Sequence, residues 1–181
     1  MDELFAPWRI EWVERDAKNP AIEDCVFCEL PSLGADRTQR VVATSERAYV
    51  LLNNYPYNPG HVMVIPRAHV GAYEELAEPD LLEHAKLKQR TLQAIDFAFE
   101  PDGCNAGLNL GGEASGGSIG DHLHTHIVPR WSGDTNFMPV IADTKVIVEG
   151  LADSYDRLHE AFADQAGATT DGTETAVQLD L

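Results

Sequence analysis

Short runs of apolar residues between positions 40 and 66 predict β-strands. Residues 40–44 and 48–53 are rich in valine, alanine and leucine, and three polar residues separate them. Two such runs joined by a short polar connection predict a β-hairpin. A turn-rich segment over 54–60 then leads into a third apolar run over 61–66, which predicts another strand.

The spacing of apolar residues changes to a helical period from residue 78. Pro79 suits a first helical turn, and the Pro-Asp-Gly sequence over 101–103 ends the helix. The pattern places His84 on the exposed side and predicts an apolar stripe at Leu81, Leu82, Ala85, Leu92, Ile95, Ala98 and Phe99. A second helix is predicted over 146–162, with one apolar side formed by Leu151, Tyr155, Leu158 and Phe162.

Two further strands are predicted around a glycine-rich loop. Residues 104–110 form an apolar run in which Cys104 is predicted to be a small core residue, and the strand over 121–131 follows the loop. The element order is hairpin, strand, helix, strand, loop, strand, helix. This order predicts an α+β fold, in which one long helix packs on an antiparallel sheet and a C-terminal helix follows.

The two ends of the chain differ from its centre. Residues 1–20 form an aromatic N-terminal arm in which Trp8 and Trp12 are predicted to pack on the core, with packing over the nucleotide site of a partner subunit as the alternative. Residues 164–181 are mainly threonine, alanine, glycine and acidic residues without periodicity, which predicts a disordered acidic tail. The domain itself is therefore expected over 21–163, and 181 residues suffice for one domain with a core.

The formal net charge of −17 narrows the classes of partner. An acidic surface repels DNA and RNA, so no nucleic-acid partner is expected. The same surface repels anionic substrates at low salt. At about 1 M salt the Debye length is only roughly 3 Å, so this repulsion is almost fully screened, and we therefore expect a surface of the halophilic type. The sequence contains no apolar run long enough for a membrane span and no signal-peptide pattern at its start, so we expect a cytoplasmic protein without a membrane partner.

Three histidines in alternate positions are the strongest candidates for chemistry. On a β-strand, His122, His124 and His126 would share one face, because successive side chains point to opposite sides. The preceding loop contains Gly116 and Gly117, whose backbone N–H groups can converge on an anion. The combination predicts a phosphate-binding loop beside candidate nucleophiles.

A C-x-x-C pair, Cys25 and Cys28, lies near the start of the predicted domain. In a cytosolic protein such a pair indicates a metal site or a redox pair rather than a structural disulfide. The chain has no second C-x-x-C, so a tetrahedral zinc site would need two histidines from elsewhere.

These motifs together resemble the histidine triad (HIT) family of nucleotide hydrolases and transferases. The resemblance lies first in the alternating histidines followed by Pro129-Arg130. It extends upstream to Leu-Leu-Asn-Asn at 51–54 and Pro-Gly-His over 59–61, and it covers about residues 25–145. It implies a HIT-like fold, a homodimer and cleavage of a nucleoside polyphosphate. Many hydrolases of the family have glutamine at the position of Ser118. The Gly-Gly-Ser sequence over 116–118 is closer to the branch that cleaves diadenosine tetraphosphate with phosphate as the second nucleophile.

The resemblance also implies roles for individual residues. His124 would attack the α-phosphorus and form a nucleotidyl-histidine, while His126 would bind the phosphate and assist the leaving group. Asn53 would contact the ribose, unless it only caps a turn, and His61 would lie near the nucleotide, unless it is a core residue. The phosphate would be held by Asn109, Gly116, Gly117 and Ser118. In the metal-bearing branch a structural zinc ion is bound by the equivalents of Cys25, Cys28, His69 and His122, and no organic cofactor is expected.

Two alternatives of other classes remain open from the sequence. The three histidines could together bind one catalytic metal ion, as in a metal-dependent hydrolase. This alternative would leave Cys25 and Cys28 without a role. The chain could also be a nucleotide-binding sensor that has lost turnover.

Overall fold

The computed structural model describes residues 24–34, 36–110, 119–135 and 149–181. The aromatic arm expected over 1–20 lies outside these residues. The strands are β1 (Val41–Thr44), β2 (Ala48–Leu52), β3 (Val62–Pro66), β4 (Gly103–Gly107), β5 (Thr125–Arg130), β6 (Ala168–Thr169) and β7 (Val177–Leu179). The helices are α2 (Val26–Glu29), α3 (Asp36–Gln39), α4 (Glu78–Phe99) and α6 (Leu151–Ala163), with 3₁₀ turns η2 (Leu30–Ser32) and η3 (Tyr73–Glu75).

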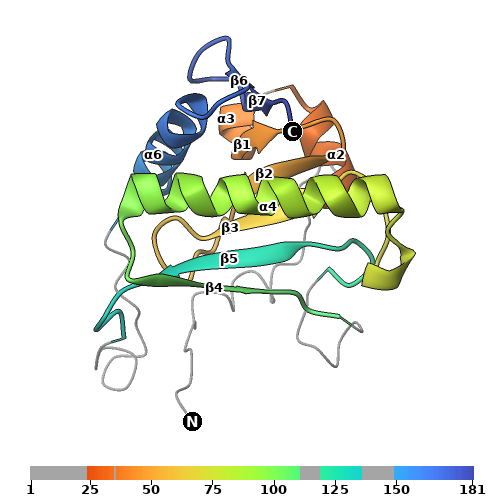
Figure 1. Cartoon of the computed structure of the whole chain (residues 1–181), viewed down its shortest axis with the longest axis horizontal. Coiled ribbons are helices and arrows are strands. Elements are labelled where there is room, and N and C mark those ends of the chain that lie inside the picture. Colours follow the sequence, from red (N-terminus) through yellow and green to blue (C-terminus); the bar gives the residue numbers. More distant parts are fainter. Residues whose placement is uncertain (1–23, 35, 111–118, 136–148) are drawn as a thin grey trace.

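The strands form one sheet in the order β4-β5-β3-β2-β1-β7-β6. All neighbouring strands pair antiparallel except β1 and β7, which are parallel. Helix α4 crosses one face of the sheet, and α6 packs beside it on the same face (Figure 1). The predicted α+β class and the hairpin of β1 and β2 are therefore confirmed.

Helix α4 begins and ends where the sequence predicts, but its buried face differs from the predicted stripe. Ile95 and Phe99 are buried as predicted, but Leu82 is 57% exposed and Leu92 is 37% exposed, and the other buried residues are His84, Leu87, Thr91 and Ala94. The prediction that His84 lies on the surface was wrong. Polar residues can occupy this face because they find partners there. The hydroxyl of Thr91 donates to the Leu87 carbonyl, and the His84 ring lies against the sheet.

The buried His84 ring lies behind the histidine segment. Its Nε2 atom is 3.3 Å from the Val64 carbonyl oxygen and 3.2 Å from the hydroxyl of Thr125, and both of these groups belong to the sheet. Burial lowers the pKa of His84, which favours the neutral ring. His84 thus connects α4 to the strand that carries His126.

Helix α6 begins at Leu151, after Gly150, and not at 146; residues 146–148 lie outside the described part of the chain. The predicted apolar side is confirmed, since Tyr155, Leu158 and Phe162 are all buried. The Tyr155 hydroxyl also donates to the Val41 carbonyl at 3.1 Å, which ties α6 to β1.

The prediction of a disordered tail over 164–181 was wrong for this structure. Strand β7 pairs with β1, and its Val177 and Leu179 side chains are buried in the core. The backbone N–H of Ala176 donates to an Asp36 carboxylate oxygen at 2.8 Å. Strand β7 has only two alternating apolar residues, Val177 and Leu179, and a pattern this short does not predict a strand from the sequence.

Strand β4 forms one edge of the sheet in the described part of the chain, and all five of its residues are exposed. Cys104 lies on this edge and is exposed, so its prediction as a core residue was wrong. The apolar run continues to residue 110, but the strand ends at Gly107. Among the described helices, none is both long and apolar enough to cross a membrane.

Gly60 fixes the loop between β2 and β3 against α4. Its φ angle is +74°, and a Cβ atom added there would lie 2.5 Å from the buried Phe99 ring.

We expect Gly60→Ala to lower the free energy of unfolding by about 2–4 kcal/mol, because backbone strain and a steric clash add together. Urea unfolding measures this loss. Gly103→Ala, where added atoms meet nothing within 4 Å, is the matched control. A loss no larger than that of the control would contradict the prediction.

Candidate functional site

The three histidines lie on the sheet face opposite α4. Strand β5 begins only at Thr125, so His126 lies in the strand, while His122 and His124 lie in the segment directly before it. The predicted alternation still holds, because the Thr125 hydroxyl points to α4 whereas the rings of His124 and His126 are in contact, with centroids 4.9 Å apart. The strand is shorter than predicted because the Leu123 N–H bonds to the carbonyl of Val70, in the loop after β3.

That loop lies very close to the histidine segment. A Cβ atom at Gly71 would lie 2.8 Å from the Gly120 carbonyl oxygen, so only glycine permits this approach. The same loop carries His69. The contact therefore sets the distance between His69 and His122.

The side chain of His124 has a defined tautomer. Its Nδ1 atom lies 2.9 Å from the His122 carbonyl oxygen, which can only accept a hydrogen bond. Nδ1 must therefore carry the proton, and Nε2 keeps the lone pair. His124 is 7% exposed, so the backbone orients a nearly buried ring with a basic Nε2 atom.

A second hydrogen-bond chain fixes His126. The backbone N–H of Tyr57 donates to His61 Nδ1 at 3.1 Å, which assigns the His61 proton to Nε2. His61 Nε2 is 3.0 Å from His126 Nδ1 and donates to it. The His126 proton is then on Nε2. Neighbouring triad rings therefore present different groups: His124 Nε2 has a lone pair, whereas His126 Nε2 carries a hydrogen.

His61 is fully buried and also stacks on the Tyr57 ring, with centroids 5.0 Å apart. It is therefore a core residue that also bonds to the triad, and its predicted position near the nucleotide stays a prediction. The role of the Tyr57 backbone N–H had no signal in the sequence, since any residue provides that group.

Asn53 occupies a turn. Its Oδ1 atom accepts a hydrogen bond from the Tyr55 N–H at 2.9 Å, and its Nδ2 atom lies 3.6 Å from the sulfur of Met63. The turn-capping role is thus present, and the predicted ribose contact stays a prediction. Asn109 is half-buried just after β4, whereas Gly116, Gly117 and Ser118 lie outside the described residues.

Sequence reasoning gave no role to a network at the other end of β5. Arg130 forms a two-pronged ion pair with Asp134, whose carboxylate also accepts from the Asn58 amide at 2.8 Å. The Arg130 guanidinium lowers the pKa of Asp134 to about 2. Asn58 additionally donates to the Pro129 carbonyl at 2.8 Å. The network therefore holds the loop containing Tyr57 against β5. The only sequence signal for this network was the Pro129-Arg130 pair that follows the histidines.

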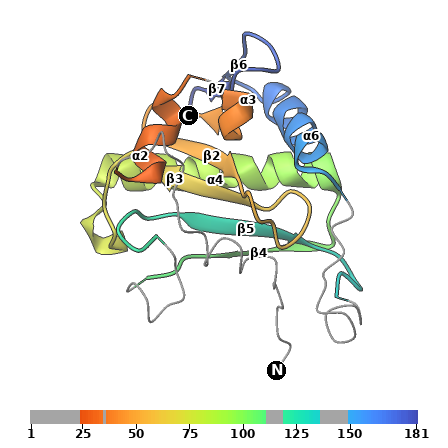
Figure 2. The same ribbon diagram turned by 180° about the vertical axis from the view of Figure 1, so that it is seen from behind.

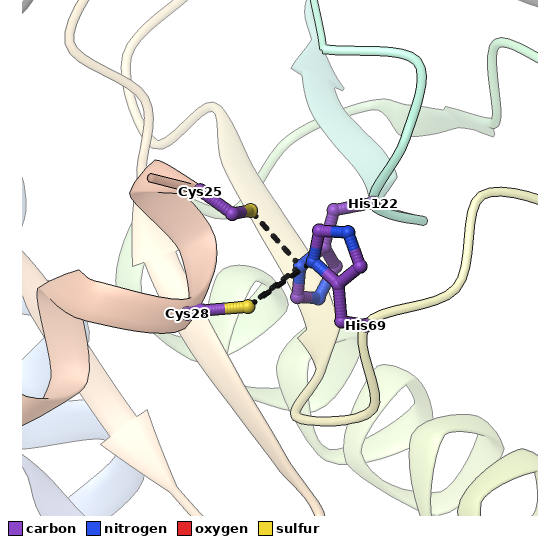
Figure 3. Close-up of side chains that lie close together, drawn as sticks. All are labelled: Cys25, Cys28, His69 and His122. Carbon is purple, nitrogen blue, oxygen red and sulfur yellow. Dashed lines mark hydrogen bonds between the residues drawn. The ribbon is translucent and has the colours of Figure 1, made fainter. Parts of the chain in front are cut away.

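A separate cluster brings the four predicted metal ligands together. One ligand atom each from Cys25, Cys28, His69 and His122 lies within 4.8 Å of all the others. Figure 3 shows the two cysteines at the start of α2 facing the two histidine rings. The sulfur of Cys25 is 3.3 Å from His122 Nδ1, and that of Cys28 is 3.2 Å from His69 Nδ1. Tetrahedral zinc, with ligands at about 2.0–2.3 Å, separates its ligand atoms by roughly 3.5 Å.

The protonation of this cluster also fits a metal cation. His122 Nε2 donates to the Pro66 carbonyl at 2.8 Å, so its Nδ1 lone pair faces the cysteines. Burial lowers the pKa of His122, which favours the neutral ring that a metal requires. Without a cation, partial burial and repulsion by Cys25, Asp121 and Glu29 raise the pKa of Cys28 to about 11. A divalent cation would displace the protons from these thiols.

This sheet, with its alternating histidines beside two cysteines, defines a protein of the histidine triad class. The model of the HIT domain family matches residues 35–133, more than half of the chain, and the chain belongs to that family. It is 39% identical over 170 residues to the AP-4-A phosphorylase of Mycobacterium tuberculosis, a match that covers 91% of this chain and 86% of the relative.

Several solved structures share the fold, and two of them illustrate the similarity. The hypothetical histidine triad nucleotide-binding protein of Sulfolobus tokodaii has a TM-score of 0.63 at 28% identity, covering 77% of this chain and 93% of that one. A zinc-bound histidine triad family protein from Mycobacterium smegmatis has a TM-score of 0.62 at 26% identity, covering 77% and 94%. The family predicted from the sequence is confirmed.

Proposed function

We propose that this protein cleaves dinucleoside polyphosphates, diadenosine tetraphosphate in particular, through a nucleotidyl group bound to His124. The observation that carries the proposal is the hydrogen bond from His124 Nδ1–H to the His122 carbonyl, because it leaves the Nε2 lone pair as the nucleophile. The similarity to AP-4-A phosphorylase supports the substrate class and an enzymatic function.

In the first step, His124 Nε2 forms a bond to the α-phosphorus while the bond from that phosphorus to the leaving phosphate oxygen breaks. His126 Nε2–H donates a hydrogen bond to the departing phosphate oxygen and stabilises the negative charge that develops there, while the proton stays on the ring. The His124 ring then carries a positive charge, which the His122 carbonyl stabilises through the existing hydrogen bond. In the second step, an oxygen of inorganic phosphate forms a bond to the same phosphorus while the bond from that phosphorus to His124 Nε2 breaks, so that a nucleoside diphosphate is released and His124 regains its lone pair. Water would replace phosphate in a hydrolase.

We assign the substrate contacts by family resemblance. Asn53 would bind the ribose and His61 would support His126 beside the nucleotide. Asn109, Gly116, Gly117 and Ser118 would bind the phosphates. The half-buried position of Asn109 just after β4, close in sequence to the glycine-rich segment, supports this assignment for Asn109.

We also propose that Cys25, Cys28, His69 and His122 hold a structural zinc ion. The spacing of the four ligand atoms and the orientation of His122 Nδ1 support this assignment. Bound zinc would supply a cross-link between α2 and the histidine segment. The geometry disfavours a catalytic metal held by the whole triad, because His122 Nδ1 faces the cysteines while His126 Nδ1 faces His61. Thiols that serve as metal ligands are consistent with the cytoplasm, where they stay reduced.

The test is product analysis after incubation with diadenosine tetraphosphate, with and without inorganic phosphate. ADP together with ATP, formed only when phosphate is present, would support phosphorolysis. AMP together with ATP would show an asymmetric hydrolase that uses the same histidine. Binding without any product would overturn the proposal in favour of a sensor.

A KCl series in the same assay tests the halophilic surface, since an activity maximum near zero salt would contradict it.

We further propose that the protein forms a homodimer through β4 and the neighbouring side of α4. The β4 edge is fully exposed, and Phe97 on α4 is 64% exposed, so both backbone and apolar groups are open to a partner. Sedimentation of the wild-type protein and of Phe97→Glu tests this interface. A wild-type monomer at micromolar concentration would contradict it.

A further inference from the structure

Phe27 lies between the two cysteines and contacts the triad. It belongs to α2 and is 3% exposed. Its ring centroid is 5.0 Å from that of His124, with the planes at 55°, and 5.6 Å from that of His122, with the planes at 84°. One apolar side chain therefore contacts both a proposed metal ligand and the proposed nucleophile.

Phe27 is itself fixed from behind. The hydroxyl of the fully buried Tyr49 donates to the Phe27 carbonyl at 2.7 Å. The side chain packs in a cluster on the face of the sheet opposite α4. Figure 2 views the ribbon of the sheet from that side. The buried members of this cluster are Phe27, Val41, Tyr49, Leu51, Met63, Ile65 and Ala176. The position of the Phe27 ring thus follows from α2 and from β2.

The His124 ring needs such a contact. Its hydrogen bond to the His122 carbonyl fixes Nδ1, but the terminal torsion of a histidine has a broad energy minimum. The rings of His126 and Phe27 both pack on the His124 ring, at centroid distances of 4.9 and 5.0 Å. Together, the hydrogen bond and the two ring contacts restrict the direction of the Nε2 lone pair.

We propose that Phe27 is a positioning residue, which orients the His124 ring for attack and links the cysteine-bearing helix to the nucleophile. The role rests on the function proposed for His124. Phe27 does not touch the reacting atoms, so it acts on the rate of nucleotidyl transfer through the ring that it contacts. A leucine at position 27 would fill much of the space without providing a flat ring to pack on.

The test compares Phe27→Leu with Val41→Ala, a control from the same cluster. Val41 lies on β1, which two strands separate from β5 in the sheet order. For each variant we would measure metal content, melting temperature, KM and the rate of nucleotidyl-histidine formation per active site in a single turnover. Phe27→Tyr, which keeps the ring, tests for rescue.

For Phe27→Leu we expect nucleotidyl transfer to slow on the order of 10-fold to 100-fold, because small displacements of a reacting group have large effects on rate. KM and metal content should stay close to those of the wild type, and Phe27→Tyr should recover most of the rate. The proposal is overturned if Val41→Ala slows the reaction equally at the same melting temperature. It is also overturned if Phe27→Leu loses its metal, because the effect would then arise from the ligands.

NMR of ¹⁵N-labelled histidine separates this inference from the proposed function. If the wild type never forms a nucleotidyl-histidine, the proposed function fails, yet the spectrum still reports on His124. A single sharp Nδ1–H tautomer of His124 in the wild type, broadened in Phe27→Leu, supports the positioning role. Identical His124 signals in both proteins would overturn it.

Discussion

Replacement of His124 by alanine is expected to lower turnover of diadenosine tetraphosphate by about 10⁴-fold or more. The variant lacks the nucleophile, and removing a covalent nucleophile in other enzymes has effects of this size. The fold should survive, because neither the metal cluster nor the hydrogen bond between His61 and His126 includes the His124 side chain. Single-turnover kinetics with labelled substrate, followed by detection of protein-bound nucleotide, measures the loss.

His126→Ala is the matched control for His124→Ala. It removes the neighbouring ring and the proposed hydrogen-bond donor to the leaving phosphate, but leaves the nucleophile and its hydrogen bond to the His122 carbonyl. We expect it to react slowly and still to accumulate protein-bound nucleotide. Turnover by His124→Ala within about tenfold of the wild-type rate would contradict the covalent mechanism, since that is far less than loss of the nucleophile produces.

Replacement of Cys25 by alanine is expected to remove the metal and to lower the melting temperature by more than about 10 °C. Binding of a structural zinc ion contributes directly to the free energy of folding, and losing one of four ligands weakens that binding strongly. Here the metal would join α2 to segments that lie about 40 and 100 residues further along the chain, as the separations between the bonded cysteines and histidines show. Metal analysis and thermal unfolding measure the two effects.

Cys104→Ala is the matched control for Cys25→Ala, because Cys104 is an exposed cysteine on β4 outside the metal cluster. It should keep both the metal and the melting temperature. The nucleotide KM of Cys25→Ala should change less than its stability does, since His124 keeps its backbone hydrogen bond. An unchanged melting curve for Cys25→Ala would show that no structural metal is bound at this cluster.

Local patterns in the sequence predicted much of the fold and the two cysteines of the proposed ligand set. The β1–β2 hairpin and the bounds of α4 follow from strand propensity, a proline in the first turn and a Pro-Asp-Gly stop, which all act within a few residues. The alternation of His122, His124 and His126 follows from the pleat of extended chain. The two histidine ligands are different: the places of His69 and His122 in the cluster were predicted from the family resemblance, and the structure brings them to Cys28 and Cys25.

Only the tertiary structure decided features that depend on partners distant in the sequence. His84 is buried because the Val64 carbonyl and the Thr125 hydroxyl lie opposite it across the packed helix. The segment after α6 forms strands because β1 offers an edge on which β7 can pair. The direction of the His124 lone pair is set by one backbone carbonyl and by the ring of Phe27. The residue types in the sequence determined which chemical groups were available. Packing determined which of their atoms face one another, because hydrogen bonds and ring contacts depend on positions in space rather than along the chain.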